Sequence, residues 1–159
     1  EQPFEYVINI QGDEPFVHEE QLRALADMLQ NQGASIATLM HPISKEEDLW
    51  NPSVVKAVPT ADGHALYFSR QTLPYLRDVP KEEWLNQRTF YRHLGLYGFR
   101  AQVLKALTQL QTSPLEQAEK LEQLGWLEAG YRIKIAPTAH ASIGIDTPED
   151  LEQAVKLLG

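Results

Sequence analysis

A short apolar run near the start of the chain, followed at once by turn residues and carboxylates, most restricts the fold of this sequence. Residues 6–15 read Tyr-Val-Ile-Asn-Ile-Gln-Gly-Asp-Glu-Pro. Val7, Ile8 and Ile10 favour a strand, and a run with so little polar interruption is typical of a strand covered on both faces. Gly12 and Pro15 are turn residues that end it. The pattern therefore predicts a buried strand in an α/β sheet.

The carboxylates behind this strand form a candidate ligand site. In open α/β sheets, ligands bind beyond the carboxyl ends of the strands. Asp13 is the better candidate there for a hard cation such as Mg²⁺, which takes few protein oxygens and completes its shell with water and phosphate. The alternative is that Gly-Asp-Glu-Pro is only a polar turn that opens a helix.

The following segments predict a sheet that begins parallel and becomes mixed. Apolar spacing predicts a helix over residues 18–30 and a strand over 34–40, a β-loop-α-β opening long enough for a parallel crossover. Ser44 and Glu47 form a capping box for a short helix that ends near Trp50. Two β-rich runs at 54–58 and 65–69 flank Asp62-Gly63, which indicates a hairpin.

The second half alternates strands and helices. Residues 70–89 are predicted to form a long loop with one helical turn. Residues 90–100 predict a strand with His93, Gly95, Tyr97 and Phe99 on one face. Further helices are predicted at 101–110, from the Ser113–Glu116 capping box to about 129–130, and after Thr147; further strands are predicted at 132–136 and 142–146.

Composition bounds the class of protein. A length of 159 residues, with 43% hydrophobic and 23% charged residues, predicts a single globular domain over residues 1–159. The net charge of −8 argues against nucleic-acid and membrane partners. The chain has no cysteine and no apolar run as long as the ~18 residues of a membrane span, so we expect a cytoplasmic protein without zinc–thiolate or thiol chemistry.

Two aspartates share the same sequence context. Asp13 and Asp146 each follow a short apolar strand, next to a glycine and before a capped helix, so they could meet at one crevice and hold a divalent metal. The alternative for Asp146 is a carboxylate that stabilises a helix N-terminus. The sequence contains no Gly-x-Gly-x-x-Gly, Walker A or Gly-x-Ser-x-Gly motif, which disfavours those phosphate loops and a serine nucleophile.

Five motifs in order resemble one enzyme family. They lie at residues 7–15 (VINIQGDEP), 65–70 (ALYFSR), 92–100 (RHLGLYGFR), 113–124 (SPLEQAEKLEQL) and 144–151 (GIDTPEDL). This series resembles the 3-deoxy-manno-octulosonate cytidylyltransferases, or CMP-Kdo synthetases, of Gram-negative bacteria. The related CMP-sialic acid synthetases share the fold but lack the His-Leu-Gly-x-Tyr and Ser-Pro-Leu-Glu blocks.

The resemblance implies a fold, a reaction and a set of site residues. The implied fold is a three-layer, Rossmann-like mixed sheet with flanking helices, as in nucleotide-diphospho-sugar transferases. The implied reaction joins CTP and the sugar acid Kdo to give CMP-Kdo and pyrophosphate with Mg²⁺, in lipopolysaccharide biosynthesis, by a homodimer. The matching metal ligands are Asp13 and Asp146, and the positions matching the sugar site are Gln11, Arg70, His93, Tyr97, Glu122 and Gln123.

The sequence departs from the family at its start. The family begins with a strand and a loop rich in Arg, Lys, Pro and Gly that binds CTP, and these 159 residues contain no match to it. We therefore expect this chain to be the C-terminal major part of a cytidylyltransferase domain and to turn over poorly alone. The alternatives are a non-catalytic sugar-acid-binding or dimerisation module, or a CMP-sialic acid synthetase relative.

Overall fold

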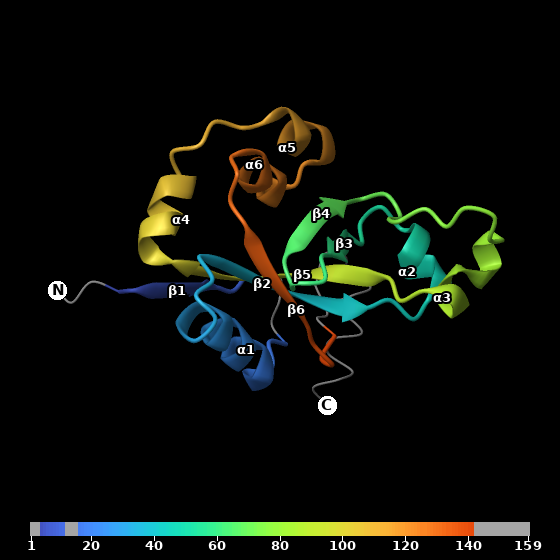
Figure 1. Ribbon diagram of the computed structural model, residues 1–159, viewed down its shortest axis with the longest axis horizontal. Coiled ribbons are helices and arrows are strands. Elements are labelled where there is room, and N and C mark those ends of the chain that lie inside the picture. The colour runs from blue at the N-terminus through green and yellow to red at the C-terminus, as the bar shows by residue number, and fades with distance from the viewer. Residues whose placement is uncertain (1–3, 12–15, 142–159) are drawn as a thin grey trace.

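The computed structural model describes residues 4–11 and 16–141, and its centre is a six-stranded mixed sheet (Figure 1). The strand order is β4-β3-β5-β2-β6, and β1 pairs with β5. Only β2 and β6 pair in parallel; the other pairs among the described strands are antiparallel. The strands are β1 (Tyr6–Asn9), β2 (Ile36–Pro42), β3 (Lys56–Pro59), β4 (Ala65–Ser69), β5 (Tyr91–Arg100) and β6 (Ile133–Pro137).

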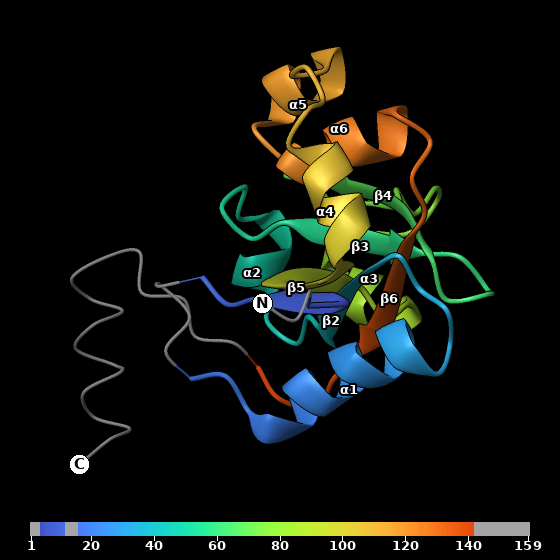
Figure 2. The same cartoon turned by 90° about the vertical axis from the view of Figure 1, so that its left-hand side faces the viewer.

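Helices cover both faces of the sheet. Helix α1 (Glu19–Gln30) packs on one face, while α4 (Ala101–Leu107), α5 (Pro114–Glu119) and α6 (Glu122–Glu128) lie over the other (Figure 2). Short helices α2 (Glu46–Trp50), η1 (Lys81–Glu83) and α3 (Trp84–Gln87) sit at one end of the sheet. No helix within these described ranges has the length and apolar character needed to cross a membrane.

Each layer has its own apolar core. Beneath α1, Leu25 and Leu29 pack against Leu94 and Leu96 of β5. The approach is close, since a Cβ at Gly98 would lie 2.8 Å from a Leu29 methyl carbon. The opposite core holds Tyr97, Phe99 and Leu124 among others. This alternation along β5 confirms the two faces predicted for residues 90–100.

The predicted crossover between the first two strands is wrong in its pairing. Strands β1 and β2 are not neighbours, because β5 lies between them and pairs antiparallel with both. Local spacing in residues 6–40 carries no information about a strand that arrives more than fifty residues later. The hairpin is confirmed: β3 and β4 are antiparallel, and Gly63 has φ 75°, in the left-handed region that glycine tolerates.

Two helix predictions need correction. The α2 N-cap is Lys45, without a side-chain cap, so Ser44 does not form the predicted capping box. The Ser113 capping box is present, but the helix predicted from there to 129–130 is two helices. It breaks at Lys120, whose backbone adopts φ 54°. The predicted strand at 142–146 and the last helix lie outside the described residues.

Candidate functional site

A gap along one edge of β5 creates the candidate site. Strand β2 pairs with β5 both at 91–94 and at 97–99, so β1 and β3 share the opposite edge. Strand β3 pairs there with Tyr91 and Arg92, whereas β1 pairs with residues 97–100. Neither strand covers the stretch between them, apart from the bond from the His93 N–H to the Val55 carbonyl. The gap leaves room for a cavity.

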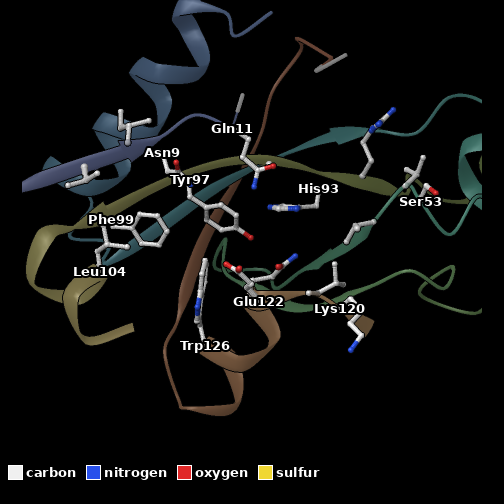
Figure 3. Close-up of a pocket in the computed structure, with 18 residues that line it drawn as sticks. Asn9, Gln11, Ser53, His93, Tyr97, Phe99, Leu104, Lys120, Glu122 and Trp126 are labelled. Carbon is white, nitrogen blue, oxygen red and sulfur yellow. The ribbon is translucent and has the colours of Figure 1, made fainter. Parts of the chain in front are cut away.

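The cavity beside this gap has a volume of about 630 Å³. Its walls come from the end of β1, the chain before β3, the face of β5 and helix α6 (Figure 3). Side chains of Gln11, His93, Tyr97 and Glu122 point into the same space. Its polar and aromatic lining includes Asn9, Gln11, Ser53, Arg92, His93, Tyr97, Phe99, Lys120, Glu122, Gln123 and Trp126.

Aromatic rings form one wall. The Trp126 ring meets Tyr97 and Phe99 edge-on, at centroid distances of 5.1 and 5.5 Å. His93 lies 5.2 Å from Tyr97 on the same face of β5. This confirms the prediction from strand alternation that His93 and Tyr97 share a side. These rings give the cavity a largely apolar wall.

The Tyr97 hydroxyl is a buried polar group without a hydrogen-bond partner among the described residues. Burial raises its pKa well above the usual value, and the nearby Glu122 carboxylate raises it further. The phenol is therefore protonated at neutral pH. A buried, unpartnered hydroxyl in a cavity wall is stabilised when a ligand supplies the missing partner.

His93 is neutral in this site. Burial lowers its pKa to about 3, so its imidazole carries one hydrogen at physiological pH. Its Nε2 lies 2.9 Å from the Thr38 hydroxyl. A neutral imidazole offers one donor and one acceptor, which suits recognition of a hydroxyl rather than of a negative charge.

The break between α5 and α6 brings Glu122 and Gln123 to the cavity. Lys120 adopts the left-handed conformation and Leu121 is extended, so the chain changes direction before α6 begins at Glu122. Gln123 is 7% exposed and both residues line the cavity. If α5 continued as one helix, its axis would carry Glu122 and Gln123 onward in the direction of α5. The break is therefore what brings these two residues to the cavity.

Arg70 is not among the residues that line the cavity. Its Nε donates to the Glu119 carbonyl at 2.7 Å and its Nη1 donates to the Pro52 carbonyl at 3.1 Å. Arg70 is absent from the cavity lining, whereas Arg92 and Lys120 are part of it. Arg92 also pairs with Asp48 at 3.7 Å. Thus the structure brings together five predicted sugar-site positions, namely Gln11, His93, Tyr97, Glu122 and Gln123.

The two aspartates proposed as metal ligands, Asp13 and Asp146, lie outside the described residues. Within the described part, His18, Glu20 and His140 form one group of possible ligands, with ligand atoms within 4.8 Å of one another. The two imidazoles are stacked, however, with centroids 3.5 Å apart and planes at 9°. The nitrogen lone pairs of stacked rings lie in parallel planes 3.5 Å apart, so one ion cannot lie in the plane of both rings.

Sequence reasoning missed several lining residues. Trp126 and Lys120 belonged to a helix that the sequence predicted as continuous, and Ser53 lies in a loop without a motif. Arg92 opens the motif at residues 92–100 but is not among the positions that match the sugar site. Closeness in sequence could have identified two of them, because Lys120 and Trp126 flank the Glu122-Gln123 pair within seven residues.

The fold is that of the nucleotidyltransferases with a nucleotide-diphospho-sugar transferase architecture. A crystal structure described as CMP:2-keto-3-deoxy-manno-octonic acid synthetase in complex with CTP superposes with a TM-score of 0.85 and 37% identity, covering 97% of this chain and 61% of that one. A protein named as a glucose-1-phosphate thymidylyltransferase from Bacillus anthracis shares the fold alone, with a TM-score of 0.58 and 15% identity.

The family follows from the sequence matches. The cytidylyltransferase family model matches residues 1–135, so this chain belongs to the cytidylyltransferase family. Among its relatives are 3-deoxy-manno-octulosonate cytidylyltransferases of Parabacteroides distasonis (48% identity; 98% of this chain, 63% of the relative) and Cytophaga hutchinsonii (51%; 94% and 60%). The chain thus spans about three fifths of the length of these relatives.

Proposed function

We propose that the whole protein containing this chain transfers CMP from CTP to Kdo, releasing pyrophosphate, in the lipopolysaccharide biosynthesis of a bacterial cytoplasm. Residues 1–159 are then the C-terminal major part of its catalytic domain. The observation that carries the proposal is the cavity beside β5. It gathers Gln11, His93, Tyr97, Glu122 and Gln123, which match the family's sugar-site positions.

The cavity suits a polyhydroxylated sugar acid. A sugar needs several donors and acceptors at fixed places together with a flat apolar surface. Tyr97 supplies an unpartnered hydroxyl, His93 a neutral imidazole, and Trp126 an aromatic wall. The sugar carboxylate is assigned to Arg70, as the family match indicates. Because Arg70 does not line the cavity, Arg92 and Lys120 are the lining cations that would share this charge.

The proposed metal is Mg²⁺, held by Asp13 and Asp146. Their carboxylate oxygens are the donors that Mg²⁺ prefers, and Gln11, two residues before Asp13, lines the cavity. When bound, the ion would neutralise charge on the CTP phosphates. The residues of the cavity hold the sugar so that its anomeric hydroxyl attacks the α-phosphate. A bond from that oxygen to phosphorus forms as the bond to the pyrophosphate oxygen breaks, and the hydroxyl proton is released to solvent.

The hairpin region is the proposed homodimer interface. Leu66 on β4 is 63% exposed, and Tyr75 in the following loop is 72% exposed. Strand β4 is the last strand of the described sheet on its side, and only its start, at His64, is bridged to Lys134 of β6. The exposed apolar groups beyond that bridge suit a partner surface. A Leu66→Asp variant should shift the whole protein towards monomer in sedimentation equilibrium. An unchanged mass would remove this interface.

Pyrophosphate release by the whole protein tests the proposed reaction. With CTP and Mg²⁺, release should depend on Kdo and fall strongly in Asp13→Ala and Asp146→Ala. Parallel assays with an amino analogue of Kdo and with a sialic acid define the acceptor. Release with sialic acid but not with Kdo would favour the CMP-sialic acid alternative. Calorimetric binding of Kdo without any release would favour a binding module.

A further inference from the structure

Thr38 is a fully buried polar residue at an irregularity between β2 and β5. It pairs with Tyr97, whereas the next residue of β2, Leu39, pairs with Leu94, so β5 carries two residues that β2 does not match. Thr38 is 0% exposed. Its side chain lies among backbone carbonyls of this irregular stretch and the His93 ring. It does not line the cavity.

The hydrogen-bond contacts of Thr38 define the direction of each bond. Its hydroxyl lies 2.8 Å from the Leu96 carbonyl and 3.3 Å from the Leu94 carbonyl. Carbonyl oxygens only accept, and a hydroxyl has one hydrogen to donate. Two oxygens 2.8 Å apart need a hydrogen between them, so the hydroxyl donates to the Leu96 carbonyl. The hydroxyl oxygen is then left to accept from the third contact, Nε2 of His93 at 2.9 Å.

This direction fixes the tautomer of His93. The imidazole is neutral and carries a single hydrogen, which the Thr38 contact places on Nε2. Nδ1 then has a lone pair, and no hydrogen bond reaches it from the described residues. The ring itself is packed against Phe68 and Tyr97, at 4.9 and 5.2 Å between centroids. Packing therefore fixes the plane of the His93 ring, and the bond to Thr38 determines which ring nitrogen donates.

We propose that Thr38 is a positioning residue that holds His93 as the Nε2–H tautomer, so that Nδ1 accepts a hydrogen bond from a sugar hydroxyl. The identity of the ligand, a sugar hydroxyl, rests on the proposed function. The assignment of the His93 tautomer does not. Thr38 does not line the cavity, so it acts on a bound ligand only indirectly, through His93 and the strand that carries it. The same bonds stabilise the irregular strand that places His93 and Tyr97 side by side.

Nuclear magnetic resonance tests the tautomer without any assumption about the reaction. In whole protein labelled with ¹⁵N-histidine, the His93 ring should show a protonated Nε2 and an unprotonated Nδ1. Thr38→Val, which keeps the shape but removes the hydroxyl, should shift the ring towards a mixture of tautomers. Thr38→Ser should retain the wild-type pattern. A wild-type ring protonated at Nδ1 would overturn the proposal even if the valine variant does not fold.

Kinetics test the link to the sugar. Thr38→Val should raise KM for Kdo about tenfold, as expected for one hydrogen bond, while KM for CTP stays unchanged. Thr38→Ser should restore KM for Kdo. Thr38→Val combined with His93→Gln should add nothing to His93→Gln alone, because the two residues act as one unit. Additive effects, or equal rises of both KM values, would contradict the positioning role. If no sugar acid supports turnover, the proposed function fails while the resonance result still decides the tautomer.

Discussion

The Nε atom of Arg70 donates to the Glu119 carbonyl over 2.7 Å, and the Arg70 backbone N–H donates to the Glu119 carboxylate over the same distance. The Ser69 hydroxyl donates a second bond to this carboxylate, also at 2.7 Å. These bonds tie the end of β4 to the end of α5, directly before the break at Lys120. The position of Glu122 and Gln123 in the cavity therefore depends on an arginine outside it.

Arg70→Gln is predicted to raise KM for Kdo by tenfold or more, because hydrogen bonds to charged groups contribute about 1.5–3 kcal/mol. Glu119→Gln separates two origins of this effect. It replaces one of the two carboxylate oxygens that accept from Ser69 and from the Arg70 backbone N–H, and it removes the charge, so a comparable rise in KM indicates that Arg70 acts by placing α6. A rise confined to Arg70→Gln indicates direct contact with the sugar carboxylate. An unchanged KM in both variants would remove Arg70 from the site.

Tyr97→Phe is predicted to separate stability from binding. The Tyr97 hydroxyl is buried without a partner among the described residues, so its removal should leave the free energy of unfolding unchanged or raise it by about 1 kcal/mol. The affinity for Kdo should fall about tenfold, since the ligand loses a donor. Chemical denaturation and calorimetric binding on the same preparation measure both quantities. A large loss of stability would show that the hydroxyl already has a partner in the protein.

His93 predicts a specific pH dependence of stability. Its pKa is about 3 in the folded chain, against an ordinary value near 6.5, so the unfolded chain binds more protons between these values. The histidine contribution to the free energy of unfolding is complete above pH 6.5 and is lost as the pH falls. In His93→Gln the slope between pH 6.5 and 5 should be smaller than in wild type. Equal slopes would show that His93 is protonated in the folded protein.

The buried amine of Lys56 leads to a prediction for the alkaline side of the pH dependence of stability. It is 0% exposed, donates to the Asn51 and Val54 carbonyls, and burial lowers its pKa to about 8. The unfolded chain retains the proton up to its ordinary pKa near 10.5, so the free energy of unfolding should rise with pH between 8 and 9.5. Above that window, ionisation of tyrosines in the unfolded chain opposes the rise. Lys56→Met should lack it, as urea denaturation at several pH values would show.

Local patterns predicted most single elements of the fold. The alternation of residues 90–100 assigned His93 and Tyr97 to one face, and Asp62-Gly63 indicated the hairpin. The insertion of β5 between β1 and β2 was not predictable in this way, because strand order is set by contacts distant in sequence. The break at Lys120 also lacks a signal. Leu115, Leu121 and Leu124 keep helical spacing across it, and lysine is not a residue that favours a left-handed turn.

The site residues likewise include some that the sequence predicted and some that only the structure shows. The five cavity residues proposed for the sugar site were predicted from likeness to a family, not from spacing. Geometry then added Thr38, whose role depends on an irregular pairing that no local pattern shows. The metal ligands Asp13 and Asp146 stay a prediction, since they lie outside the described residues.

Binding of Kdo to paired glutamine variants tests the central claim most directly, namely that the cavity beside β5 is the sugar-acid site. Gln123→Leu removes a cavity-lining amide, whereas Gln117→Leu makes the same change at an exposed position on α5. Calorimetry on the whole protein, with Mg²⁺ and a CTP analogue that cannot transfer its nucleotide, gives the Kd for Kdo. We predict a Kd raised about tenfold or more in Gln123→Leu and unchanged in Gln117→Leu. Equal affinity in wild type and both variants would contradict the assignment of this cavity.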